Sequence, residues 1–294
     1  MRAKKSGTLT TVIVILIFVA GLSLLLYPTV SNYWNSLHQS EIISSYDDEM
    51  SRLEQETFQT LLMEARNYNR ELAENHLQYV LSEQQREVYY NSLKISSGSA
   101  MAYVEIPVID CQLPIFHGTG DDVLERAVGH LEWSSLPVGG ESTHCVISGH
   151  RGLPTSELLT NIDHMEKGDL FYIHVLGETL TYRVDQIAVV EPNDFSLLGI
   201  EKGADYVTLL TCTPYGINSH RLLVRGTRVD GGEDSQLIQD PSNEVRTLDS
   251  AALVVGVLLA VAVVVFVWLV IDSKRKKKAK GGKRLLEKEK KWPW

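Results

Sequence analysis

The chain has 294 residues, enough for one large domain or two small ones, and three cysteines. An odd number of cysteines excludes a framework in which every thiol is paired within the chain, so at least one thiol is expected to be free. The formal net charge is −9 at neutral pH, but the basic residues gather near the two ends of the chain and leave the middle strongly acidic.

The first apolar segment covers residues 10–27 and follows a cytoplasmic N-terminus, residues 1–9, that carries Arg2, Lys4 and Lys5. This pattern fits either a cleaved secretory signal or a retained membrane anchor. Because no clear small-x-small cleavage site follows, the sequence favours a retained anchor. In both cases the residues that follow lie outside the cytoplasm.

A second apolar segment, residues 251–271, contains no charged side chain and is long enough to cross a bilayer as a helix. The tail that follows, residues 272–294, holds 11 Lys or Arg and three acidic residues. Basic flanks stay in the cytoplasm, so two spans with an extracellular domain between them are predicted. Beside a span, the basic tail indicates contact with lipid headgroups, and no nucleic acid is implied.

Residues 28–98 form a helical lead-in to the extracellular domain. Residues 41–93 contain neither proline nor glycine, and their apolar positions recur at three- and four-residue steps. We expect two helices joined near residues 54–57. The sequence SSGS at residues 96–99 then marks a flexible boundary.

Residues 99–230 change to short β-rich runs separated by turn residues, which indicates a mainly β fold, either a closed barrel or a sandwich. Short helices are expected at residues 121–128 and 155–162, a tight hairpin at Gly177-Glu178, and a polar tether at residues 231–250. The expected strands lie in AYVEIPVID, QLPIFHG, HCVISGH, DLFYIHV, LTYRVDQIAVVE, DYVTLLTC and HRLLVRGTRV.

Cys212 ends the apolar strand DYVTLLTC, and Arg221 opens the next strand nine residues later. If the two strands pair as a hairpin, Cys212 and Arg221 face each other, while Arg225 lies about 13 Å further along its strand. Arg225 and Arg228 are then expected to be solvated charges. A fixed guanidinium beside a thiolate can stabilise the oxyanion that forms when sulfur attacks a carbonyl.

A cysteine nucleophile needs a proton acceptor, and His150 has the best context among nine histidines because it projects from the glycine-flanked turn SGHRG. His220 is expected to be structural, since neighbours on a strand point to opposite faces. The remaining histidines show no metal-ligand spacing, and no cofactor is implied. Cys111 and Cys145 fit small core residues, although a bridge between them stays open.

The motifs TLLTC and TPYGINSHRLLVRG, with VISGHRG upstream, resemble those of the class C sortases, which polymerise pilins. The resemblance covers roughly residues 101–228, and the helical lead-in and second span also fit. It implies a closed eight-stranded sortase-type barrel flanked by two transmembrane helices, with Cys212 as nucleophile, His150 as acid/base and Arg221 as oxyanion or substrate-positioning residue. It further implies cleavage of an LPXTG-like signal between Thr and Gly, and transfer to a pilin lysine.

One departure concerns the lid that class C enzymes usually carry ahead of the barrel, with the motif Asp-Pro-aromatic. No proline lies between Pro28 and Pro107, so this motif is absent. Cys212 is therefore expected to be less tightly guarded, with residues 73–98 as at most a loose cover. Tyr79 and Tyr89 in that segment are expected to be helix-face packing residues.

Two other functions remain open. A sorting-peptide-binding adaptor would have no need of Cys212, His150 and Arg221 together. An extracellular cysteine protease would use the same three residues, and only products formed with an added amine distinguish it from a transpeptidase.

Overall fold

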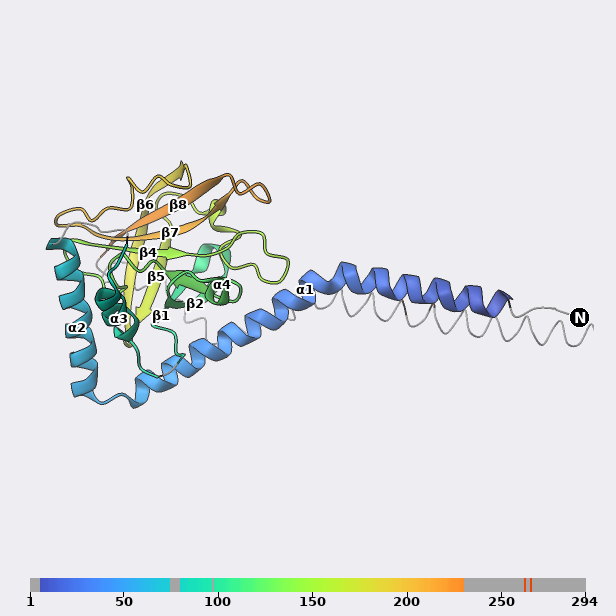
Figure 1. The fold of residues 1–294 in the computed structure, drawn as a ribbon, viewed down its shortest axis with the longest axis horizontal. Helices are drawn as coiled ribbons and strands as arrows, with labels where there is room; N and C mark the ends of the chain where they lie inside the picture. Colours follow the sequence, from blue (N-terminus) through green and yellow to red (C-terminus); the bar gives the residue numbers. More distant parts are fainter. Residues whose placement is uncertain (1–5, 75–79, 97, 230–261, 263–264, 266–294) are drawn as a thin grey trace, which may run out of the picture. The chain divides into compact units, whose positions relative to one another are not determined.

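The structure, a computed structural model, describes residues 6–74, 80–96 and 98–229, together with Ala262 and Val265 (Figure 1). Helix α1 runs from Ser6 to Arg52, α2 from Gln55 to Glu74 and α3 from Glu83 to Asn91. The predicted break near residues 54–57 is confirmed. Residues 41–93 were expected to form two helices, but they contribute to three, because α3 is separate from α2.

Within the described residues, α1 is the one helix long and apolar enough to cross a membrane, judged by length and composition only; a signal sequence would pass the same criterion. Residues 10–27, the predicted anchor, lie in this helix. Residues 251–271, the other predicted span, lie outside the described residues apart from Ala262 and Val265. The second span therefore stays a prediction. Val30–Ile238 is a compact unit of its own.

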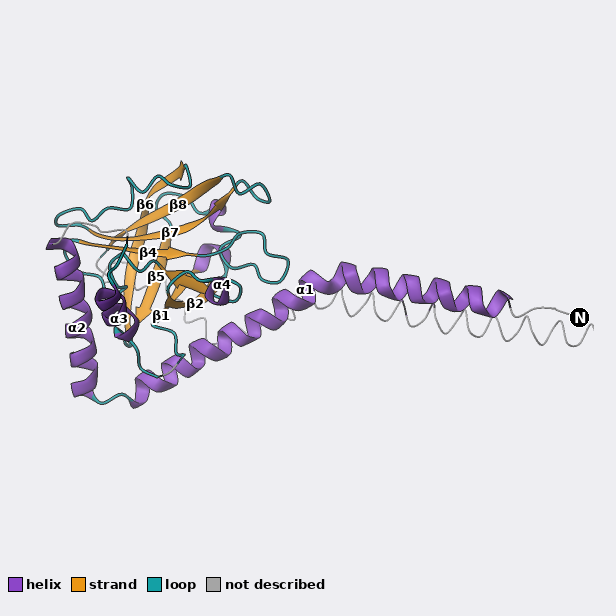
Figure 2. Ribbon diagram, in the orientation of Figure 1, coloured by secondary structure: helices purple, strands orange, loops and turns teal. Residues whose placement is uncertain are grey.

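Eight strands close into one barrel in the order β1-β2-β3-β4-β7-β8-β6-β5 (Figure 2). This confirms the predicted mainly β fold and the eight-stranded barrel. The pairs β2–β3 and β4–β7 are parallel, and the other neighbours are antiparallel. The strands are β1 Ala102–Ile106, β2 Cys111–His117, β3 Val128–His130, β4 Thr143–Ser148, β5 Leu170–Val175, β6 Glu178–Val190, β7 Asp205–Thr213 and β8 His220–Arg228.

All seven predicted strand segments contain a strand, and the strand that was missed is β3, which has only three residues. It begins at Val128, the last residue of the helix expected at residues 121–128, and the helix that forms there, α4, covers only Asp121–Leu124. The hairpin turn also lies one residue earlier than expected. Val175 pairs with Glu178, and the turn residues Leu176 and Gly177 both have positive φ.

The prediction of a helix at residues 155–162 is wrong. The segment forms turns and ends in a single 3-10 turn, η2, Ile162–His164. Its backbone is bonded to α1 instead: the Glu157 amide donates to the side chain of Asn32 at 2.8 Å, and Asn35 donates to the Thr155 carbonyl at 2.7 Å. These contacts with a distant element override the local helical pattern.

The helices ahead of the barrel belong to the same hydrophobic core as the strands. Ala65 of α2 and Tyr89 of α3 are fully buried, in one cluster with barrel residues such as Ile115 and Phe171. Tyr46 of α1 lies in a second cluster with Phe116 of β2, and its hydroxyl accepts from the Leu176 amide at 2.7 Å. The lead-in therefore contributes to the stability of the barrel.

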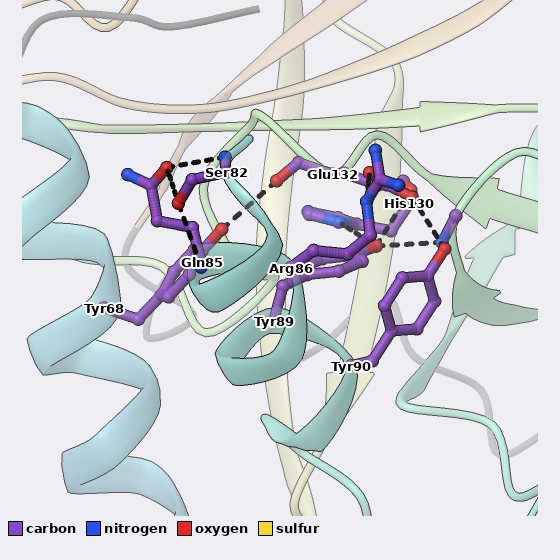
Figure 3. A network of polar contacts seen from close by, with 9 residues as sticks. Tyr68, Ser82, Gln85, Arg86, Tyr89, Tyr90, His130 and Glu132 are labelled. Atoms are coloured by element: carbon purple, nitrogen blue, oxygen red, sulfur yellow. Dashed lines mark hydrogen bonds and ion pairs between the residues drawn. The ribbon is translucent and has the colours of Figure 1, made fainter. Parts of the chain in front are cut away.

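Helix α3 is fixed to the barrel by a buried tyrosine (Figure 3). The hydroxyl of Tyr89 accepts from the Gly118 amide at 2.9 Å and lies 3.0 Å from both Nδ1 and the carbonyl oxygen of His130. The expectation that Tyr89 packs on a helix face is confirmed. At its N-terminus, α3 has a reciprocal capping box between Ser82 and Gln85.

Glu132, just after β3, gathers three further contacts. Its carboxylate accepts from Tyr90 at 2.6 Å and pairs with Arg86 at 3.3 Å, while its carbonyl accepts from Tyr68 of α2 at 3.1 Å. These contacts anchor α3 to the barrel, and the expectation of a loose cover over Cys212 stays a prediction. In Figure 1, α2 and α3 lie on the left of the barrel, whereas the loop joining β7 to β8 lies at its right.

Candidate active site

The β7–β8 hairpin places Cys212 directly opposite Arg221. The two strands pair antiparallel with Leu210 opposite Leu223 and Cys212 opposite Arg221, which confirms the predicted register. Both strands extend one residue beyond this pair, so the loop covers residues 214–219. The amide of Asn218 donates to the Pro214 carbonyl at 2.9 Å and closes that loop.

Alternation along β7 puts Cys212 on the outer wall of the barrel. Val207, Leu209 and Thr211 are buried, the first two in the barrel core, so Leu210 and Cys212 point to the opposite face. Cys212 is partly exposed at the end of this row, beside the apolar side chain of Leu210. A thiol at such a place can meet a substrate without entering the core.

His150 follows β4, the parallel neighbour of β7. Ser148 pairs with Leu210, and continuing the register by two residues brings His150 level with Cys212. Two hydrogen bonds hold the intervening Gly149: its amide donates to the Leu210 carbonyl at 3.0 Å, and its carbonyl accepts from Thr211 at 2.7 Å. The two strand ends that carry His150 and Cys212 are thus fastened together one residue before each of them.

Glycine is required at position 149 by packing. A Cβ atom there would lie 2.8 Å from the Leu159 side chain and 2.9 Å from that of Val128. The other flanking glycine, Gly152, has φ +78° and lies against the ring of Tyr215, which comes from the β7–β8 loop. The glycines in SGHRG therefore bring the His150 turn close to the Cys212 hairpin.

Arg221 differs from the next arginine on the same face of β8. Its Nη1 donates to the carbonyl oxygens of His220 at 3.1 Å and Asn218 at 3.4 Å, and among the described residues no salt bridge joins it to a carboxylate. Arg225 binds both carboxylate oxygens of Asp185, at 3.1 and 2.7 Å. It also lies over the ring of Tyr206. The expectation that Arg225 is a solvated charge is wrong, because β6 pairs with β8 and supplies Asp185.

Cys111 and Cys145 are not bonded to each other, since all three cysteines are free. Burial raises the pKa of the Cys111 thiol to about 12, and it raises the pKa of the Cys145 thiol further above its ordinary value. Cys145 is a core residue, as expected. Thiols held in the neutral form are poor nucleophiles, which leaves Cys212 as the candidate.

Several histidines have structural partners. His144 bonds Thr208 and the Gly199 carbonyl, and burial lowers its pKa. His220 lies 3.4 Å from Glu191. Among the residues that the structure describes, no group of three or more His, Cys, Asp or Glu side chains could hold a metal ion.

Arg151 is not among the residues that the sequence predicts for the site. This side chain lies between the two strand ends, with Nη1 donating to the Thr213 hydroxyl at 3.2 Å and Nη2 paired with Asp163. Its position in the sequence could have identified it, because Arg151 is a charged residue directly after His150 in a turn otherwise made of small and apolar residues.

Comparison with known proteins identifies this architecture. The profile of the sortase domain matches residues 104–229. Sortase D of Bacillus subtilis (strain 168) is 32% identical over 141 residues, which are 47% of this chain and 68% of that protein. The chain belongs to the sortase family.

Two solved structures refine the assignment. The sortase C of Streptococcus pneumoniae, described in relation to catalysis and pilin substrate specificity, is 48% identical with a TM-score of 0.59, covering 65% of this chain and 97% of that one. The sortase C of Clostridium perfringens with the C-terminal cell wall sorting motif is 43% identical with a TM-score of 0.58, covering 65% and 99%. This sortase is accordingly a class C enzyme and a cysteine transpeptidase.

Proposed function

We propose that this sortase cleaves an LPXTG-like sorting signal between Thr and Gly and transfers the acyl group to a lysine amine of a pilin, with Cys212, His150 and Arg221 as its catalytic residues. The observation that supports this most is the pairing of Cys212 with Arg221 at the hairpin end, beside the strand end that carries His150. The pilin and the sorting motif named for the two sortase C relatives support the substrate class.

In the first half-reaction, the Cys212 thiolate attacks the carbonyl carbon of the Thr–Gly peptide bond. The carbonyl oxygen becomes an oxyanion, which the Arg221 guanidinium stabilises. Arg221 stays charged throughout and cannot act as a base. His150 gives a proton to the departing glycine amine as the C–N bond breaks, leaving a thioester on Cys212.

In the second half-reaction, the acceptor amine attacks the thioester carbonyl and His150 takes up the proton that the amine loses. The C–S bond breaks, an isopeptide bond forms and the Cys212 thiolate is regenerated. Arg221 stabilises this second oxyanion in the same position, so one guanidinium serves both steps.

Apolar side chains beside Cys212 suit the Leu and Pro of a sorting signal. Leu210 and Val190 lie in the same face as Cys212 and Arg221 and are only partly buried, packed on a cluster formed by Val146, Leu198 and Leu223. The substrate arrives through the membrane with the pilin, so we place the enzyme at the outer surface of the cell membrane, held by α1 and by residues 251–271.

The test uses the full chain in detergent, a peptide ending in a sorting signal and a peptide with a single lysine. Mass spectrometry should detect the thioester on Cys212 alone and a product joined through the lysine side chain. Hydrolysed peptide without the joined product would indicate a protease. Peptide binding without any cleavage would indicate an adaptor, and either result would contradict the proposal.

A further inference from the structure

Arg151 is a buried cation that the proposed chemistry does not use. Its side chain is only 9% exposed, whereas that of its partner Asp163 is 39% exposed. Its Nε is enclosed and has no hydrogen-bond partner among the residues that the structure describes. Burying a guanidinium with one donor unsatisfied costs free energy. A charge kept in place at that cost calls for an explanation.

The position of Arg151 in the chain explains why the buried charge is kept. Its backbone follows His150 directly, and its Nη1 bonds the side chain of Thr213, which follows Cys212 directly. The β4–β7 ladder has ended by then, with Ser148 opposite Leu210 and the two bonds of Gly149. Beyond that point, the Arg151 side chain joins the segment of His150 to the strand of Cys212 through its bond to Thr213.

The ion pair with Asp163 gives this link its orientation. Asp163 lies in η2, at the far end of the turn segment that begins after His150. Nη2 pairs with the Asp163 carboxylate, while Nη1 reaches Thr213, so the planar guanidinium spans three places in the chain. A lysine has a single ammonium on a flexible stem and could not hold both partners in one fixed geometry.

We propose that Arg151 is a positioning residue that sets the His150 ring against the Cys212 thiol, acting through Thr213 and Asp163. The inference rests on the proposed roles of Cys212 and His150. Reacting groups displaced by about 1 Å can lose on the order of 10²-fold in rate. Loss of Arg151 is therefore expected to lower kcat by about 10- to 100-fold, with little change in KM.

The decisive experiment is a double-mutant cycle in the full chain, with kcat and KM for formation of the joined product and the thermal midpoint measured for each variant. Arg151→Ala should be strongly impaired in the wild-type background. In the His150→Ala background it should cause no further loss, because a positioning residue has nothing left to position. Arg151→Lys should recover little.

Arg86→Ala is the matched control, because Arg86 also pairs with a carboxylate, Glu132, but on α3. It should leave kcat unchanged. Thr213→Val replaces the hydroxyl that accepts from Arg151 with a methyl group of similar size, and it should reproduce part of the loss in kcat even if Arg151→Ala does not fold.

Equal losses from Arg151→Ala in both backgrounds would overturn the inference, as would normal kcat in both Arg151→Ala and Thr213→Val. If His150→Ala itself kept full activity, the proposed function would fail instead, so the two failures can be distinguished.

Discussion

The two ends of the barrel are held together in different ways. At the end covered by α3, Tyr89 and His130 are fully buried and bonded to each other, and Glu132 ties two helices to the strand that precedes it. At the other end, Cys212 and Arg221 are partly exposed, and the His150 turn is fastened through Gly149 and Arg151. Buried, satisfied polar networks fix one arrangement of a core, whereas reacting groups must remain accessible. The first end should therefore govern stability and the second activity.

Cys212→Ala gives the largest expected difference between the ends. It removes the proposed nucleophile and should abolish the thioester, while the fold should remain intact because the side chain is not in the core. Cys111→Ala and Cys145→Ala are the controls and should still form the thioester, since burial raises the pKa of both thiols. Mass spectrometry of protein trapped with a sorting peptide measures this. Thioester mass on another cysteine would refute the assignment.

His150→Ala and Arg221→Ala should each lower kcat/KM by at least about 10²-fold, as expected for loss of an acid/base or an oxyanion donor. Arg221→Lys should recover little, because an ammonium lacks the planar fork of a guanidinium.

Arg225→Ala is the informative comparison for Arg221→Ala. It breaks the bonds to Asp185 and should lower the free energy of unfolding while sparing kcat. If Arg225→Ala damaged kcat and Arg221→Ala did not, the assignment of the catalytic arginine would be wrong.

Stability at the α3 end should depend on pH through His130. Its Nε2 donates to the Ser135 carbonyl at 2.8 Å, and its Nδ1 lies 3.0 Å from the Tyr89 hydroxyl. Burial lowers the pKa of His130 from 6.5 to about 4. The unfolded chain therefore takes up a proton between pH 6.5 and 4 that the folded chain does not.

The free energy of unfolding should accordingly fall as the pH falls through this window, by up to about 3 kcal/mol from His130 alone. Urea denaturation at several pH values measures the fall, with His130→Asn as the control that should reduce it. A fall of the same size in both proteins would assign the dependence to other groups, such as His117, whose pKa is also lowered by burial.

Tyr89→Phe should lower the free energy of unfolding by about 1–3 kcal/mol, because it leaves the buried Gly118 amide without its acceptor. Thermal unfolding of the full chain would measure this. The kcat of the folded protein should be unchanged, with Val88→Ala, an exposed position on the same helix, as the neutral control. A large loss of kcat in Tyr89→Phe would show that the two ends are coupled.

The sequence was most informative where local patterns decide structure. Alternation along DYVTLLTC and HRLLVRGTRV was sufficient to predict the pairing of Cys212 with Arg221, because a hairpin involves only neighbouring residues. The sequence pattern did not predict the contacts between segments that are distant in the chain. Asp185 reaches Arg225 only through the β6–β8 pairing, and β3 is too short to show a period of its own.

The roles of the site residues could be proposed from sequence because family motifs surround them, but their supports could not. Arg151 reaches Thr213 and Asp163 across separations of 62 and 12 residues. Nothing in the spacing of these residues indicates that they meet. The firm packing of residues 80–96 could not be predicted for a related reason: the buried contacts of Tyr89 with Gly118 and His130 depend on how α3 packs. Whether Cys212 is less guarded than in other class C enzymes stays a prediction.

The smallest expected effect concerns the hydrogen bonds between α1, the helix that precedes the barrel, and the segment that follows His150. Asn32, Asn35 and Gln39 follow one another on one face of α1, at spacings of three and four residues. Their amides bond the Glu157 amide, the Thr155 carbonyl and the Ser156 hydroxyl, all in the segment between Arg151 and Asp163. This face of α1 therefore holds the segment that joins Arg151 to its partner Asp163.

Asn35→Ala removes one of these bonds and should lower kcat/KM by about 2- to 10-fold, the equivalent of about 0.5–1.5 kcal/mol for one hydrogen bond. Asn67→Ala on α2, where the asparagine bonds the exposed Arg70, is the matched control and should be silent. Both variants are best measured in the full chain, because truncation ahead of the barrel would also remove core residues such as Tyr46 and Ala65. Equal activity in the two variants would show that α1 supports the fold of the His150 turn without influencing its chemistry. A loss confined to Asn35→Ala would instead show that α1 influences the chemistry of the proposed active site.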